Sequence, residues 1–266
     1  MPPASPPIDD ALLTKVEAIA ERAGQVILRF YEAGVQARAK ADASPVTAAD
    51  EAAEAEIIPA LQALMPAVPV VSEEAVSAGH CPEIRGDRNP SNCFWLVDPL
   101  DGTKEFLSRN GEFTVNIALI DHDRPLLGVV HIPTLAATYG GIVGVTARVR
   151  RGDGQMRKIA ARSPPPDGAI VLSSRSHGDD SALDAFLSGK QIAGQRIAGS
   201  ALKFCLVAEG VADLYPRFGR TMEWDTAAGH AVVAAAGGSV TTLDGAPLRY
   251  GKPDFANPHF VAHGRR

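Results

Sequence analysis

The chain has 266 residues, of which 45% are hydrophobic and 21% are charged, a composition typical of a globular protein with one large domain or two smaller ones. The formal net charge of −5 provides no global basic field, which argues against nucleic acid or an anionic membrane surface as the main partner. No apolar run reaches the ~18 residues of a membrane-spanning helix, so we expect no transmembrane segment.

Two amphipathic helices are predicted at the start of the chain. Apolar residues recur at helical spacing over residues 8–30, which indicates a long helix packed on a core. A second helix is predicted from Thr47, which has the spacing of an N-cap pair with Asp50. Pro59 is expected to kink or restart this helix.

Strands dominate the next part of the chain. Residues 68–74 read as a short buried strand that ends in the carboxylates Glu73 and Glu74, and residues 77–92 as a surface loop. The apolar run CFWLV (93–97) is predicted to be another buried strand. Residues 113–120, 124–133 and 137–144 then predict a meander of successive strands.

The stretch RSPPPDG (162–168) is the best candidate for a domain boundary. We predict a metal-binding α+β domain over residues 1–160 and a substrate-binding α/β domain over residues 161–266. The second part is expected to contain a strand at 169–177, a helix at 181–189, a strand–helix–strand unit at 195–218, and a small-residue helix that stops at Gly237 and Gly238. Mixed helices and strands in both halves indicate an α+β or layered α/β fold.

The stretch FWLVDPLDGTKEF places two aspartates three residues apart. Pro99 disfavours helix at Asp98, so we expect the strand to turn there and bring Asp98 and Asp101 together. Two close carboxylates repel each other, and a bound cation removes that repulsion. Carboxylates, a backbone carbonyl such as that of Leu100, and water are ligands that suit Mg²⁺ or Mn²⁺.

An anion site is predicted beside these carboxylates. Gly102, Thr103 and Lys104 are typical of a helix start, where backbone N–H groups bind anions and glycine allows close approach. Glu73 and Asp225, each at the end or start of an element, could supply further metal ligands. A metal-bound phosphate indicates metal-assisted phosphoryl transfer, most simply to water. The absence of a Walker-type lysine loop argues against an NTP-dependent kinase.

Each of these acidic residues also has a purely structural interpretation. The residues alone do not decide between that interpretation and a role in metal binding or catalysis. Asp-Pro and Asp-Gly pairs form turns in many proteins, and Asp50 could simply cap its helix. Glu73 could end a strand in solvent, and Asp225 could complement a helix dipole. The histidines lack metal-ligand spacing.

Three segments in their order and spacing resemble the inositol monophosphatase superfamily of Mg²⁺-dependent, lithium-sensitive phosphatases. They are SEE, WLVDPLDGTKEF and WDTAAGHAV, and the resemblance extends roughly from residue 8 to residue 260. It implies two or three Mg²⁺ ions and a layered αβαβα sandwich, with an antiparallel sheet in the first half, a mixed sheet in the second and the active site between them.

The resemblance also assigns roles to individual residues. The metal ligands it implies are Glu73, Asp98, the Leu100 carbonyl, Asp101 and Asp225. Asp50 would face a further metal and the nucleophilic water, and Thr103 would orient that water together with Asp50.

The second half resembles a narrower group, the 3'(2'),5'-bisphosphate nucleotidases of the CysQ type, in SSRSH, GSALKFCLVAEG and DLYPRFG. This implies that the enzyme hydrolyses the 3'-phosphate of adenosine 3',5'-bisphosphate to AMP and phosphate and so supports sulfate assimilation. The implied substrate contacts are Gly102, Thr103, His177, Ser200, Lys203 and Arg217. One departure is Arg220, which stands where close relatives tend to have proline, and it leaves the fine substrate preference open.

Two other functions remain as alternatives. One is an inositol or sugar monophosphatase of the same superfamily, and the other is a catalytically silent protein that binds a phosphorylated ligand for regulation. The presence of both Asp50 and Thr103 argues against the silent protein, because a binder has no need to activate water.

The cysteines and the first residues bear on location. Cys81, Cys93 and Cys205 form no Cys-x-x-Cys pair, which fits a reducing compartment and provides neither a disulfide framework nor a thiolate metal site. The opening MPPASPPIDD lacks a basic segment followed by an apolar core, so we expect no secretory signal and a cytoplasmic protein. The sequence leaves open the oligomeric state and peripheral attachment to the cytoplasmic face of the inner membrane.

Overall fold

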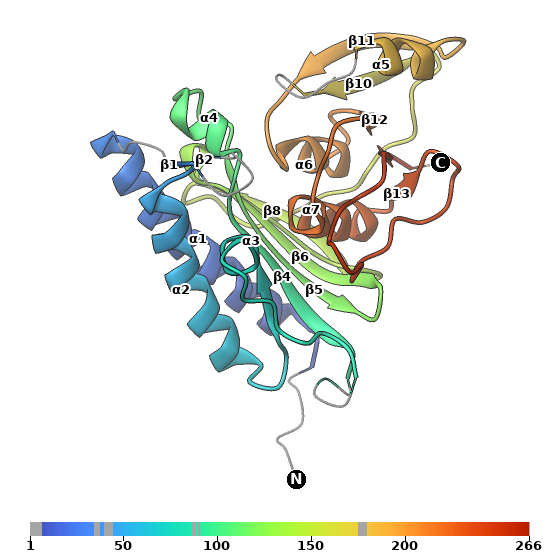
Figure 1. The fold of residues 1–266 in the computed structure, drawn as a ribbon. Coiled ribbons are helices and arrows are strands. Elements are labelled where there is room, and N and C mark those ends of the chain that lie inside the picture. The colour runs from blue at the N-terminus through green and yellow to red at the C-terminus, as the bar shows by residue number, and fades with distance from the viewer. Residues whose placement is uncertain are drawn as a thin grey trace.

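The computed structural model describes residues 7–34, 38–39, 45–86, 89, 91–174 and 180–265. In this part of the chain the helices and strands lie in five layers in the order αβαβα (Figure 1). The predicted layered α+β fold, with one sheet from each half of the chain, is confirmed. No helix among these residues is both long enough and apolar enough to cross a membrane.

The outer layer beside the first sheet consists of α1 (Asp10–Ala33) and α2 (Ala48–Leu64). Helix α1 begins where the Asp9 carboxylate accepts a hydrogen bond from the backbone N–H of Leu12 at 2.9 Å, and it ends at Gly34 in the left-handed region. Helix α2 continues through Pro59, so the predicted restart there is wrong. Buried residues on both sides of the proline hold the helix against its neighbours and offset the one lost hydrogen bond.

The first sheet has seven strands among the described residues, in sequence order. They are β3 (Val70–Ser72), β4 (Cys93–Asp101), β5 (Thr114–Asp121), β6 (Arg124–Ile132), β7 (Ala137–Ile142), β8 (Thr146–Arg151) and β9 (Arg157–Lys158). The predicted antiparallel meander is confirmed, although β3 at the edge runs parallel to β4. Strands β8 and β9 were not predicted, because charged residues interrupt their apolar pattern.

Strand β4 is covered on both faces, which explains its continuous apolar run. Phe94 and Leu96 belong to the apolar cluster on the side of the central helices, whereas Trp95 and Val97 belong to the cluster beneath α1 and α2. The predicted turn at Asp98 is wrong, because β4 continues to Asp101. Its pairing with β5 instead shifts register between Asp98 and Asp101, as expected where a proline cannot donate to the ladder.

The central layer contains α6 (Leu202–Ala208) and α7 (Glu223–Ala235). Helix α7 approaches the first sheet closely because both surfaces carry small residues. A side chain on Gly128 of β6 would collide with Ala228 and Ala231 of α7. Helix α7 ends before Gly237, which has a φ of 89°, as predicted. A helix from the second half of the sequence thus packs directly on the sheet of the first half.

The second sheet is mixed, as predicted, with strand order β11-β10-β12-β14-β13. Its strands are β10 (Ala169–Ser173), β11 (Ile192–Ile197), β12 (Leu214–Arg217), β13 (Ser239–Thr242) and β14 (Phe260–His263). Strand β10 is parallel to β11 and β12, and β14 is antiparallel to β12 and β13. Helix α5 (Asp180–Leu187) lies beside β10 and β11 (Figure 1).

The remaining elements are short. They are β1 (Arg38–Ala39), β2 (Pro45–Val46), α3 (Glu73–Ser77), α4 (Thr103–Leu107) and the 3-10 turn η1 (Pro133–Leu135). The two large sheets separate between Lys158 and Ala169, around the predicted boundary at residue 160. That the two halves are separate domains stays a prediction.

Candidate active site

A cleft of about 240 Å³ lies between the two halves of the chain. The first half contributes the end of β4 and the start of α4, and the second contributes the ends of β10 and β12 and the starts of α6 and α7. The predicted site residues that line it are Glu73, Asp98, Leu100, Asp101, Gly102, Thr103, Ser200, Lys203, Arg217 and Asp225. Asp50 lies directly behind Thr103, and His177 is outside the described residues.

Three carboxylates converge at one side of the cleft. Oxygen atoms of Glu73, Asp98 and Asp225 all lie within 4.8 Å of one another. The parallel pairing of Ser72 with Val97 places the residues that follow them, Glu73 and Asp98, next to each other. Asp225 arrives from the first turn of α7, where one of its oxygens accepts a hydrogen bond from the N–H of Met222 at 2.8 Å.

The surroundings of Asp225 disfavour its negative charge. Burial, and then the nearby carboxylates of Asp101 and Glu73, raise the pKa of Asp225 well above its ordinary value. A divalent cation would offset both effects, and a set of only carboxylate oxygens suits Mg²⁺ rather than zinc. The residues present therefore fit the predicted magnesium site.

Asp101 accepts hydrogen bonds from both halves of the chain. Its Oδ2 accepts a hydrogen bond from the N–H of Ala201 at 2.7 Å, and from Asn116 and Thr114 at 3.3 Å each. Burial raises the pKa of Asp101 to about 6, although the Lys203 ammonium opposes this effect. Asp101 thus lines the cleft beside the three-carboxylate group and is held by β5 of its own half as well as by the turn before α6.

The register shift between Asp98 and Asp101 is accompanied by a local side-chain contact. The Oδ1 of Asp98 accepts a hydrogen bond from the N–H of Leu100 at 3.0 Å, and Asp98 is only 1% exposed. The chain then enters α4 through Gly102, whose φ is 92°. A side chain on Gly102 would collide with the hydroxyl group of Ser200, so glycine is required here by both conformation and space.

Asp50 and Thr103 form a pair at the start of α4. The Oδ2 of Asp50 accepts hydrogen bonds from the N–H and the hydroxyl of Thr47, at 2.8 and 2.6 Å. Its Oδ1 lies 3.3 Å from the Thr103 hydroxyl, which is also 3.4 Å from the Leu100 carbonyl oxygen. The capping interpretation and the catalytic interpretation of Asp50 are therefore compatible, because each uses a different oxygen.

Lys203 is buried, unlike most lysines. It is 3% exposed, and its ammonium donates to the carbonyl oxygens of Ala198 and Ser200 at 3.0 and 2.8 Å. Burial lowers the pKa of Lys203 to about 8, with the Asp101 carboxylate acting in the opposite direction. Lys203 therefore supports the turn before α6 as well as lining the cleft.

Arg217 stands at the end of β12 and faces the cleft from the second sheet. Its guanidinium donates to the Ser174 hydroxyl at 2.6 Å and to the Arg220 carbonyl oxygen at 3.3 Å. Arg220 is exposed and also lines the cleft. Lys203, Arg217 and Arg220 thus give the second half of the cleft a cationic character opposite the carboxylates of the first half.

Sequence reasoning missed several cleft residues. Glu105 and Thr226 line the cleft, and both lie inside motifs that were recognised for their neighbours. Their position within DGTKEF and WDTAAG was the available signal. No signal in the sequence indicated the contacts of Asp101 with Ala201 and Asn116. One involves a backbone N–H and the other a strand asparagine, and neither belongs to a recognisable motif.

The chain matches the family model of the inositol monophosphatase family over residues 9–265. It is 46% identical over 252 residues to the 3'(2'),5'-bisphosphate nucleotidase CysQ of Shigella flexneri, which covers 94% of this chain and 98% of that protein. The corresponding Salmonella typhimurium protein is 44% identical over the same shares of the two chains. The crystal structure of CysQ from Bacteroides thetaiotaomicron superposes with a TM-score of 0.78 at 37% identity, covering 97% of this chain and 99% of that one. The chain belongs to the inositol monophosphatase family.

Proposed function

We propose that this protein is a Mg²⁺-dependent 3'(2'),5'-bisphosphate nucleotidase, which hydrolyses the 3'-phosphate of adenosine 3',5'-bisphosphate to AMP and phosphate and so supports sulfate assimilation. The observation that carries this proposal is the convergence of Glu73, Asp98 and Asp225 beside the start of α4. The cationic side of the same cleft is formed by Lys203, Arg217 and Arg220. The 46% identity to nucleotidases of the CysQ type supports the choice of substrate.

Five residues would hold two or three Mg²⁺ ions. They are Glu73, Asp98, Asp101 and Asp225 through their carboxylates and Leu100 through its carbonyl. Bound Mg²⁺ stabilises the negative charge that develops on the attacking and leaving oxygens of a phosphoryl transfer. The chain contributes the arrangement of these ligands before the substrate arrives, because the Met222 and Leu100 N–H groups orient Asp225 and Asp98.

Asp50 and Thr103 would deprotonate the attacking water. A water that donates to the Thr103 hydroxyl oxygen can transfer a proton there, while Thr103 passes its own proton to Oδ1 of Asp50. Thr47 holds the other oxygen of Asp50, so Oδ1 stays directed at Thr103. Proton removal is thus assigned to a pair whose geometry the start of α2 maintains.

The two phosphates of the substrate would be held at opposite sides of the cleft. The backbone at Gly102 and Thr103 offers N–H groups to the phosphate that is cleaved. Lys203 and Arg217 would pair with the phosphate that remains, with Ser200 and His177 as further contacts. A substrate with a second anionic group needs donors away from the carboxylates, and Lys203 and Arg217 would supply them.

A cytoplasmic location is part of the proposal. Cys81, Cys93 and Cys205 are free thiols, as expected in a reducing compartment. The sequence leaves peripheral contact with the inner membrane open, and cell fractionation would test it.

The test is phosphate release from adenosine 3',5'-bisphosphate, inositol 1-phosphate and fructose 1,6-bisphosphate, each with Mg²⁺ and after chelation. We expect the highest kcat/KM with the nucleotide and no turnover without the metal. A preference for inositol 1-phosphate or the sugar phosphate would instead assign a monophosphatase. Absence of turnover with all three, together with tight binding of one, would assign a silent binding protein.

A further inference from the structure

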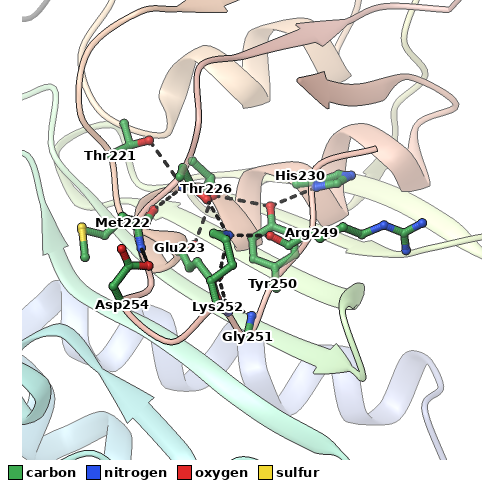
Figure 2. Close-up of polar contacts among 12 residues, drawn as sticks. Thr221, Met222, Glu223, Thr226, His230, Arg249, Tyr250, Gly251, Lys252 and Asp254 are labelled. Atoms are coloured by element: carbon green, nitrogen blue, oxygen red, sulfur yellow. Dashed lines mark hydrogen bonds and ion pairs between the residues drawn. The ribbon is translucent and has the colours of Figure 1, made fainter. Parts of the chain in front are cut away.

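The start of α7, which carries Asp225, is held by a second segment of the chain. Figure 2 shows Thr221, Met222, Glu223 and Thr226 beside the loop that contains Lys252. Residues 255–257 pair with this start in an antiparallel manner through the bridge between Met222 and Ala256. In addition, the N–H of Glu223 donates to the Phe255 carbonyl at 2.8 Å.

Asn257 contacts this start from both its backbone and its side chain. Its backbone N–H donates to the Thr221 carbonyl oxygen at 2.9 Å. Its side-chain amide donates to the Met222 carbonyl oxygen at 2.7 Å and to the Thr226 hydroxyl oxygen at 3.0 Å. The amide therefore joins the residue before α7 to the residue that follows Asp225.

These contacts determine where the N–H of Met222 points. The Thr221 carbonyl and the Met222 N–H belong to one planar trans peptide and point in opposite directions. Because Asn257 holds that carbonyl from one side, the N–H is directed to the other side, where it donates to Oδ2 of Asp225 at 2.8 Å. The side-chain bond to the Met222 carbonyl fixes the next peptide in the same way.

Lys252 orients the amide of Asn257. Its ammonium donates to the amide oxygen of Asn257 at 3.3 Å, to the carbonyl of Arg249 at 2.6 Å and to Glu223 at 2.6 Å. An ammonium has only donors, so the amide oxygen must face it and the NH₂ group must face Met222. Glu223 itself is fully buried and accepts from the N–H of Gly251 at 2.6 Å (Figure 2).

We propose that Asn257 is a positioning residue, which holds Asp225 in place for Mg²⁺ through the peptides on either side of Met222. This inference rests on the proposed metal site and adds to it a residue that does not line the cleft. Partners that orient a metal ligand typically change metal affinity about 10- to 100-fold when they are removed.

The experiment measures Mg²⁺ binding to the full-length, metal-free protein by calorimetry, together with the kinetic constants. For Asn257→Ala we expect Mg²⁺ affinity to fall about 10-fold and kcat to fall at limiting Mg²⁺, with an unchanged KM for the nucleotide at saturating Mg²⁺. Asn257→Asp keeps the shape but loses the NH₂ donors. If added negative charge were the only effect, this variant would bind Mg²⁺ more tightly, whereas loss of positioning predicts weaker binding.

Asn89→Ala is the matched control. Asn89 is fully buried whereas Asn257 is half-buried, but the Asn89 amide likewise donates to two carbonyl oxygens, those of Ile84 and Cys93, which belong neither to α7 nor to residues 255–257. We expect this variant to lose stability without losing Mg²⁺ affinity. Equal Mg²⁺ affinity in the parent protein and both Asn257 variants would overturn the inference while leaving the metal site intact. A parent protein that binds no Mg²⁺ would instead overturn the proposed function.

Discussion

The hydroxyl oxygen of Ser200 lies 2.9 Å from the carbonyl oxygen of Asp101, and this contact joins the two halves of the chain at the centre of the cleft. The same hydroxyl lies 2.7 Å from the carbonyl oxygen of Glu112, and Ser200 adopts a positive φ of 46° to reach both. The next residue, Ala201, donates its N–H to the Asp101 carboxylate. A turn from the second half therefore orients a proposed metal ligand from the first half.

Replacing Asp101 with asparagine should nearly abolish turnover without unfolding the protein. Removing one anionic ligand weakens charge stabilisation in the transition state, and we expect kcat/KM to fall more than about 100-fold. The pKa of Asp101 is raised to about 6, so at neutral pH its ionisation opposes folding in the absence of metal. The metal-free variant should therefore melt no lower than the parent, while Mg²⁺ should stabilise it less. A folded variant with near-normal activity would contradict the site assignment.

Thr103→Ala tests the water-activating pair. The variant should bind Mg²⁺ and substrate almost normally, because the carboxylates and the backbone at Gly102 are unchanged. Loss of general-base assistance predicts a fall in kcat of about 10²–10⁴-fold. Thr103→Ser, which retains the hydroxyl group near Asp50, is the control and should recover much of the rate. An unchanged kcat with a higher KM would show that Thr103 only holds the phosphate.

Lys203→Ala separates the nucleotide substrate from smaller ones. Loss of a charge-assisted contact to the second phosphate predicts a fall in kcat/KM of roughly 10- to 100-fold for adenosine 3',5'-bisphosphate. Hydrolysis of a small monophosphate that never reaches Lys203 should be much less affected. The buried ammonium also supports Ala198 and Ser200, so a lower melting temperature is expected as well. Equal losses for both substrates would mean that the second phosphate is not recognised there.

His131 should make the protein less stable in mild acid. Burial lowers its pKa from 6.5 to about 4, and its Nε2 finds no hydrogen-bond partner among the described residues. Between these two pH values the unfolded chain binds a proton that the folded protein does not, so stability falls as the pH falls through this range. The contribution approaches 1.4 kcal/mol per pH unit in the middle of the range, by the relation of about 1.36 kcal/mol to one pKa unit. Denaturant titrations across this range should show a shallower decline for His131→Asn, and an identical decline would contradict the prediction.

Local features of the sequence were sufficient for much of the fold. The helical spacing from residue 8, the Thr47–Asp50 pair and the glycines after α7 each specify an element through contacts within a few residues. The order of three acidic segments was likewise sufficient to place the family. These signals can be recognised in the sequence because caps, turns and amphipathic faces are formed by residues that are close together along the chain.

Other predictions were wrong where contacts with residues distant in sequence determine the local structure. Strand β4 continues past Pro99 because β5 pairs with it up to Asp101, and α2 continues past Pro59 because buried residues hold both of its ends. The burial of Lys203 depends on packing of α6 in the central layer, and nothing in the residues around it distinguishes it from a surface lysine.

The amino-acid sequence by itself was sufficient to identify the acidic residues of the candidate site, the helix start beside them and the family of the protein. Short contiguous motifs contain each of these features. Only the tertiary structure decided which groups hold the acids in place. Asp101 is oriented by Ala201, and Asp225 by a peptide that Asn257 fixes from the far end of the chain. Such contacts arise when segments far apart in sequence come together around a buried charge, whose hydrogen bonds must then be satisfied by whichever groups surround it.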